Sequence, residues 1–202
     1  MSTDVRAERA VREAVDRTVD TFGRIDIVAN NAGYALFGAV EETMDAEARA
    51  LFDTNVLGVL NVHRAVLREQ RSGHILQGSS LLRAVGPCRC RAAGHDQNAV
   101  EGISDALAAE VAPLGIHVTI IEPRPTATAF LANLHFATAI DAYDQTVRAV
   151  QKSLSEAPPE ALSSPASAAK AILTATHTEH PPLRPLGNSG RRRHAHCPKQ
   201  PY

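Results

Sequence analysis

Several polar side chains in this sequence have the type and the surroundings that binding or proton-transfer chemistry requires. Asn55 lies within an apolar segment, DTNVLGVLNV, and a buried asparagine must find hydrogen-bond partners or cost about 1 kcal/mol or more. Ser79 and Ser80 end an apolar run, HILQGSS, where a hydroxyl can bind a ligand or cap a loop. Histidine is the side chain suited to proton exchange near neutral pH, and His95 is the candidate here.

Cysteine and histidine side chains also raise the question of a metal site. Cys88 and Cys90 fall in PCRCRAAGHDQ (87–97), and Cys197 falls in GRRRHAHCPKQPY (190–202). An odd number of cysteines with no framework spacing argues against a disulfide scaffold. Their spacings, and those of the nearby histidines, match no structural zinc pattern, so we predict no metal site.

The elements that must position these residues alternate along the chain. Some segments show apolar residues at helical spacing, and others are short, nearly continuous apolar runs typical of buried parallel strands. We predict strands at 25–30, 74–80 and 116–123, and helices at 5–22, 43–67, 98–115, 138–155 and 164–176. The alternation predicts right-handed βαβ crossovers, and therefore an α/β fold with a doubly wound parallel sheet.

The composition is that of one soluble globular domain. The chain has 202 residues, of which 44% are hydrophobic and 21% charged, and its formal net charge is -1. A net charge this close to zero does not indicate a surface that binds nucleic acid. No apolar run reaches the roughly 18 residues of a membrane span. Without a secretory signal, we expect a cytoplasmic protein. We assign residues 1–188 to one domain and expect residues 189–202 to be a disordered tail.

Three segments follow one another in an order that is specific to a known family. They are FGRIDIVANNAG (22–33), DTNVLGVLNV (53–62) and NAVEGISDALAAEVAPLGIHVTIIEP (98–123). Together they resemble the classical short-chain dehydrogenase/reductase family, and the likeness covers residues 4 to about 131, with weaker echoes to about 188. The resemblance implies a Rossmann-type sheet, NAD or NADP as cofactor, and hydride transfer to or from a carbonyl or alcohol substrate.

The resemblance assigns five residues to the cofactor site. Asp4, followed by valine, matches an Asp-Val pair beside the adenine ring, although an aspartate there is also typical of a helix cap. Asn31, Ala32 and Gly33 match the stretch whose backbone lies against the adenosine ribose, and Asn31 is also expected to tie neighbouring strands together. Thr128 matches a threonine that contacts the nicotinamide carboxamide.

The same resemblance assigns two residues to catalysis and leaves the central acid/base pair vacant. Ser80 matches the serine that hydrogen-bonds the substrate oxygen, and Asn55 matches the asparagine that helps to hold a proton-relay water. The family uses a tyrosine as general acid/base, with a lysine four residues later that lowers its pKa. These positions are Ala93 and Gln97 here, and neither side chain can do this chemistry. His95 is the one residue of the segment that we consider as a substitute.

The start of the chain also departs from the family pattern. The sequence has no glycine-rich T-G-x-x-x-G-x-G turn to bind the pyrophosphate. We therefore expect an N-terminally truncated member that lacks about 60 residues, the first βαβαβ segment, and so leaves the strand at 25–30 as a bare edge with weak cofactor affinity. Residues 87–97 and the tail interrupt the pattern, and we interpret them as out-of-frame readings of an ancestral coding sequence.

Two functions follow from these observations. The first is an NAD(P)-dependent oxidoreductase by descent that no longer turns over its carbonyl or alcohol substrate. The second is a non-catalytic remnant that associates with protein, in a homo- or hetero-oligomer, through the helices at about 43–67 and 98–113. In either case we expect neither a nucleic-acid nor a membrane partner.

Overall fold

The fold is an α/β arrangement around a three-stranded parallel sheet, as the sequence predicts. The computed structural model describes residues 2–70, 72–80, 95–123, 125–126, 128, 130, 134–156, 158 and 162–185. The sheet has the order β1-β3-β4, with bounds β1 (Ile27–Asn30), β3 (Gly73–Gly78) and β4 (Ile116–Ile121). Val28 pairs with Ile75, and Ile75 pairs with Val118. The predicted strands are thus confirmed, each one or two residues shorter than expected.

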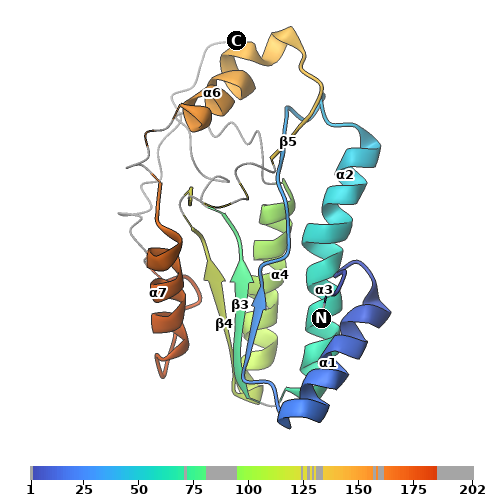
Figure 1. Cartoon of the computed structure of the whole chain (residues 1–202), viewed down its shortest axis with the longest axis vertical. Coiled ribbons are helices and arrows are strands. Elements are labelled where there is room, and N and C mark those ends of the chain that lie inside the picture. The colour runs from blue at the N-terminus through green and yellow to red at the C-terminus, as the bar shows by residue number, and fades with distance from the viewer. Residues whose placement is uncertain are drawn as a thin grey trace.

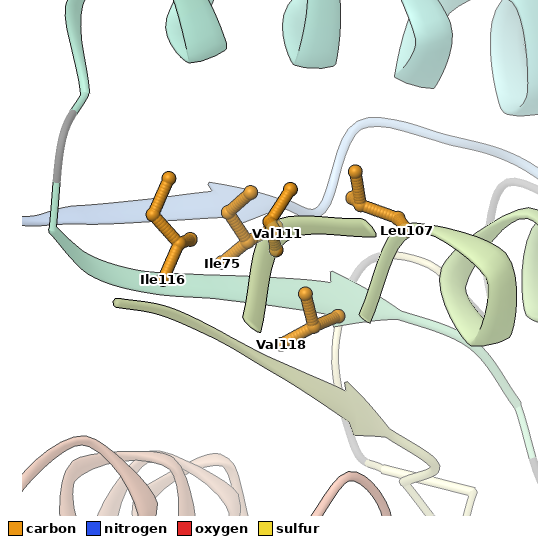
Figure 2. Close-up of a cluster of buried hydrophobic side chains, with 5 residues drawn as sticks. All are labelled: Ile75, Leu107, Val111, Ile116 and Val118. Carbon is orange, nitrogen blue, oxygen red and sulfur yellow. The ribbon is translucent and has the colours of Figure 1, made fainter. Parts of the chain in front are cut away.

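Helices cover the sheet on both faces (Figure 1). The helices α1 and α3 pack against each other beside β1, and α4 packs along β3 and β4. The helix α7 lies on the opposite side of the sheet (Figures 1 and 2). The bounds are α1 (Glu8–Phe22), α2 (Asp45–Phe52), α3 (Gly58–Glu69), α4 (His95–Val111), α6 (Ala149–Ser155) and α7 (Pro165–Thr176). The first helix ends at Gly23, with φ 80°, as predicted.

Two apolar clusters hold these layers together. Figure 2 shows the first, between the sheet and α4, which consists of Ile75, Leu107, Val111, Ile116 and Val118. The second lies between α1 and α3 and consists of Val11, Val15, Ala65 and Val66. The helical spacing of the valines in the first helix therefore does mark its buried side, as the sequence suggests.

The helix predicted at 43–67 is right in extent but wrong in regularity. It consists of α2, a π-helical turn η1 (Asp53–Leu57), and α3, which ends at Glu69. The Gly58 N–H donates to the Asp53 carbonyl, five residues back, so the backbone is locally underwound. Such π-turns inside helices often mark functional positions. This one contains Asn55.

Two further helix predictions need correction. The helix predicted at 98–115 begins at His95, and its α-helical part ends at Val111, before a short 3-10 turn (Ala112–Leu114). Residues 95–97 are therefore helical, although we treated them as outside the helix pattern. The helix predicted at 138–155 is split into a 3-10 turn (Asp141–Tyr143), a π-turn (Asp144–Arg148) and α6. By contrast, Ser164 caps α7 as predicted, accepting from the Ser167 N–H.

A second, two-stranded parallel sheet was not predicted. It pairs β2 (Leu36–Phe37) with β5 (His135–Phe136), and strands of two residues are too short to show periodicity. The buried carboxylate of Glu42 ties these segments together: it accepts from the backbone N–H groups of Ala39 (2.6 Å) and Ile140 (2.8 Å) and pairs with the Arg148 guanidinium. The N–H of Ile140 is the largest cause of a lowered Glu42 pKa.

The sheet has two different edges. Within the described residues β1 pairs with β3 alone, and its Ile27 side chain is 50% exposed, so the expectation of an exposed edge strand is confirmed. At the other edge, the Ile120 N–H donates to the Leu183 carbonyl at 2.7 Å, so the chain after α7 covers β4. No helix in the described part of the chain is long and apolar enough to cross a membrane. The predicted tail at 189–202 lies outside the described residues.

Candidate functional site

Asn55 lies at the centre of the candidate site and is only 3% exposed. Its Oδ1 accepts from the Tyr34 N–H at 3.1 Å, and its Nδ2 donates to the Tyr34 carbonyl at 2.7 Å. The side-chain amide thus pairs with both backbone groups of one residue, as a neighbouring strand would. Its second Nδ2 proton goes to the Asp96 carboxylate at 2.6 Å. Both donor protons are therefore engaged within the protein, and a relay water could bind only at Oδ1.

Asp96 is a buried carboxylate that the sequence analysis missed. It is 3% exposed, and its Oδ2 accepts from Asn55 and, at 2.8 Å, from the Gln97 side chain. Gln97, at the position of the family's lysine, is thus directed to a neighbouring carboxylate. Asp96 also contributes to the raised pKa of Tyr34, of which desolvation is the largest cause. Its place one turn after position 93 could have identified it, had residues 95–97 been assigned to the helix.

The stretch from Asn31 to Gly33 is exposed and follows directly after β1. Gly33 approaches Asn55 so closely that an added Cβ would lie 2.9 Å from Oδ1, so only glycine fits here without a shift. Asn31 was expected to tie the strands together, but the structure gives that role to Asn30. The Asn30 Nδ2 donates to the Gln77 side chain on β3 at 3.1 Å.

Asn30 belongs to a buried polar network that joins β1, β3 and α3. Its Nδ2 also lies 2.9 Å from His63 Nε2 on α3. Because Nδ2 only donates, His63 Nε2 accepts, and the ring proton must be on Nδ1. Burial lowers the pKa of His63 to about 4, so the ring is neutral at physiological pH.

A shallow depression lies beside the 31–33 stretch. It is lined by Val5, Asn30, Ala32, Thr54, Gly58, Val59 and Val62. Val5 lies against Gly58, where an added Cβ would be 2.7 Å from its methyl carbon. The segment carrying Asp4 and the stretch carrying Ala32 are therefore brought together.

Asp4 does not cap a helix, because α1 begins at Glu8 with Ala7 as its N-cap. Its Oδ1 accepts from the Arg6 backbone N–H at 3.0 Å, and its Oδ2 pairs with the Arg6 guanidinium at 2.7 Å. The hydrogen bonds from the Arg6 side chain and then backbone lower the Asp4 pKa to about 2. The carboxylate thus closes a turn just before the helix.

Ser79 and Ser80 follow the end of β3, at the edge of the sheet where the 31–33 stretch leaves β1. Ser80 is half-buried, whereas Ser79 is buried and its hydroxyl donates to the Glu101 carboxylate on α4 at 2.8 Å. Of the two serines, Ser80 is therefore the more accessible to a substrate oxygen. The resemblance had selected the same residue.

The sequence also indicates further candidates. Thr128 is exposed, and its N–H donates to the Thr126 carbonyl at 2.8 Å. His95 is exposed at the first residue of α4. Ala93 lies outside the described residues, as do Cys88, Cys90 and Cys197. Within the described part, no three histidine, cysteine or acidic side chains are grouped as metal ligands would be.

Residues 31–33 follow the carboxyl end of β1, and Ser79 and Ser80 follow the carboxyl end of β3. Proteins of this α/β architecture bind dinucleotides at this edge of the sheet. Residues 1–138 match the family model described as short chain dehydrogenase, and the chain belongs to that family.

Known proteins agree with this assignment. The chain is 37% identical over 190 residues to Oxidoreductase BOA17 of Botryotinia fuckeliana, covering 92% of this chain and 69% of that protein. It is similar to the crystal structure of a short-chain dehydrogenase from Streptomyces avermitilis, with a TM-score of 0.80 and 33% identity over 91% of this chain and 68% of that one. The structure of ElxO with NADP bound gives a TM-score of 0.70 at 25% identity, covering 90% and 71% of the two chains.

Proposed function

We propose that this chain is an NAD(P)-dependent oxidoreductase by descent that retains the adenosine-contacting stretch and Ser80 but has lost proton transfer. The observation that carries the proposal is the environment of Gln97, whose amide donates to Asp96. A glutamine carries no charge, and so it can neither depress the pKa of a neighbouring acid nor compensate for alanine at position 93. The substrate of the ancestral reaction is a carbonyl compound or an alcohol.

Turnover is tested by following NADH and NADPH oxidation at neutral pH with a panel of ketones and aldehydes. Loss of the general acid/base alone costs on the order of 10² to 10⁴ in rate, so we expect no oxidation above the protein-free blank. The Asp96→Asn variant is the matched control, because it removes the buried carboxylate that binds Asn55 and Gln97 and keeps its acceptor oxygen. Turnover by the wild-type chain that Asp96→Asn abolishes would show that the proton chemistry survives, and would refute the proposal.

Cofactor binding is a separate question, and calorimetric titration with NADH and NADPH answers it. The sequence offers no glycine-rich loop for the pyrophosphate, so we expect a Kd weaker than about 100 μM for both nucleotides. Ala32→Glu places a carboxylate beside the depression, and Ala106→Glu adds the same charge on the exposed face of α4. A Kd for either nucleotide below about 100 μM, lost in Ala32→Glu but kept in Ala106→Glu, would show that the depression binds the cofactor without a glycine-rich loop.

The second candidate function is association with another protein through α2, α3 and α4. Phe52, the last residue of α2, is 36% exposed, and Leu57, in the π-turn η1 between α2 and α3, is 48% exposed. The exposed face of α4 presents small residues, Gly102, Ala106 and Ala109, which allow a helix to approach closely. The partner would be a second copy or a full-length relative.

This second function predicts a complex that size-exclusion chromatography with light scattering can detect, alone or mixed with a full-length short-chain dehydrogenase. Ala106→Arg on α4 should abolish it, whereas Leu173→Arg on the exposed side of α7 should not. A monomer in both experiments at tens of micromolar protein would refute it.

A further inference from the structure

Glu101, on α4, is a buried carboxylate whose two oxygens serve different parts of the fold. Its Oε1 accepts from the Ser79 hydroxyl at 2.8 Å, and its Oε2 accepts from the Arg184 guanidinium at 3.2 Å. The Glu101 side chain is 9% exposed and that of Arg184 is 21% exposed. One carboxylate therefore links the end of β3 with the segment that follows α7.

Ser79 is held at two points. Its backbone N–H donates to the Ile121 carbonyl of β4 at 2.8 Å, and its hydroxyl is bound to Glu101. The first bond holds the Ser79 backbone beside the end of β4, and the second holds the Ser79 side chain against α4. Ser80 is the next residue, so its direction depends on both.

Arg184 reaches Glu101 because the segment before it is docked on the sheet. The Leu183 carbonyl accepts from the Ile120 N–H, and the Pro182 carbonyl accepts from the Thr119 hydroxyl at 3.1 Å. The guanidinium also binds Asp105 through both terminal nitrogens, at 2.6 and 2.9 Å. The hydrogen bonds that the guanidinium donates to Asp105 are the largest cause of a raised Arg184 pKa, so this charge is permanent.

We propose that Glu101 is a positioning residue that sets the orientation of Ser80 by holding the Ser79 hydroxyl, and that Arg184 orients Glu101 for this purpose. The proposal rests on the role of Ser80 in the proposed function. A permanent cation on one carboxylate oxygen leaves the other oxygen aimed at Ser79, and α4 supplies the rigid support. The segment after α7 thereby acts on the end of β3 through Glu101.

The alternative is that the pair is only a structural link between α4 and the C-terminal segment. The two explanations differ in where order is lost when the contact to Ser79 is removed. Amide hydrogen exchange, followed by NMR on the full-length chain without ligand, reports this residue by residue. A structural link would lower protection throughout the sheet, whereas positioning predicts a local loss at Ser79 and Ser80.

Three variants make the test. Ser79→Ala removes only the hydroxyl, Glu101→Gln keeps an acceptor for it, and Val118→Ala opens a cavity in the neighbouring cluster without touching either group. We expect Ser79→Ala to speed exchange at Ser80 about tenfold more than at Ile120, and Glu101→Gln to change their ratio by less than about threefold. Val118→Ala should speed both amides equally.

Equal acceleration of Ser80 and Ile120 in Ser79→Ala would overturn the proposal, as would a Glu101→Gln variant that loses Ser80 protection to the same extent as Ser79→Ala. Neither result depends on cofactor or turnover. The proposed function fails instead if the wild-type chain binds NADPH tightly and oxidises it, and the two failures are therefore distinguishable.

Discussion

The replacement of Asn55 by alanine is the sharpest test of the candidate site. The asparagine makes three hydrogen bonds, two to the backbone of Tyr34 and one to the Asp96 carboxylate. Alanine removes them together and leaves their partners, the buried Asp96 and the partly buried Tyr34 backbone, without this amide. Within the described residues Asp96 would then keep only the Gln97 amide as a hydrogen-bond donor.

The magnitude follows from the kinds of bond lost. Each backbone bond contributes about 1 kcal/mol and the bond to a carboxylate about 2 kcal/mol, so the free energy of unfolding should fall by about 3 to 4 kcal/mol. With a urea dependence of about 2 kcal/mol/M, the midpoint should fall by about 1.5 to 2 M. The corresponding fall in Tm is about 10 °C.

Urea titration followed by circular dichroism is the suitable assay, because the chain has no tryptophan to report by fluorescence. Thr54→Ala is the matched control: it is the neighbouring residue, and its hydroxyl bonds only to a carbonyl of its own helix, at 3.2 Å. The reasoning is refuted if Asn55→Ala shifts the midpoint no further than Thr54→Ala does.

Three further predictions use the same assay. Gly33→Ala should lower the free energy of unfolding by about 1 to 2 kcal/mol, because the added Cβ would lie 2.9 Å from Asn55 Oδ1. Gly102→Ala is the control: its added Cβ has nothing within 4 Å, and alanine should stabilise α4. The folded-state pKa of His63 is depressed from 6.5 to about 4, so wild-type stability should fall by up to about 3 kcal/mol as the pH drops through this window, and His63→Gln should flatten that dependence. An acid dependence that His63→Gln leaves unchanged would show that the folded-state pKa of His63 is not depressed. The pKa of Glu42 is lowered from 4.5 in the folded state, chiefly by the Ile140 N–H. The ionised carboxylate therefore stabilises the fold above pH 4.5, and this contribution is lost as the pH falls through the folded-state pKa. Glu42→Gln should lower the free energy of unfolding at pH 7 and weaken its dependence on acid pH. A Glu42→Gln variant whose free energy of unfolding falls with acid pH as steeply as that of the wild type would contradict this.

The order and type of the main elements could be predicted because each has a strong local signal. The continuous apolar run of β4 and the spaced valines of α1 are unambiguous patterns. The need of Asn55 for hydrogen-bond partners follows from its place in an apolar helix and from the cost of burying an amide. These predictions depend on local sequence or on one well-supported alignment.

What could not be predicted depends on contacts between distant residues. The β2–β5 pair joins residues about a hundred positions apart and contributes two residues from each strand. The π-turn at Asp53–Leu57 changes the helix register without changing its composition. Asp96 was overlooked because its burial follows from α4 beginning at His95, and the residues before it carry no helix pattern.

The Asn55 clamp has a consequence for how this protein can vary. It binds the peptide groups of Tyr34 and none of its side-chain atoms, so it accepts any residue at position 34 that has a backbone N–H. Proline is the one exclusion, since it lacks that donor. The clamp therefore fixes the backbone at position 34 whatever residue stands there. The Tyr34 side chain is constrained separately, because it packs against the cluster of Leu36, Leu51 and Ala137 and lies edge-on to the His135 ring. A substitution that keeps the clamp therefore still changes this packing.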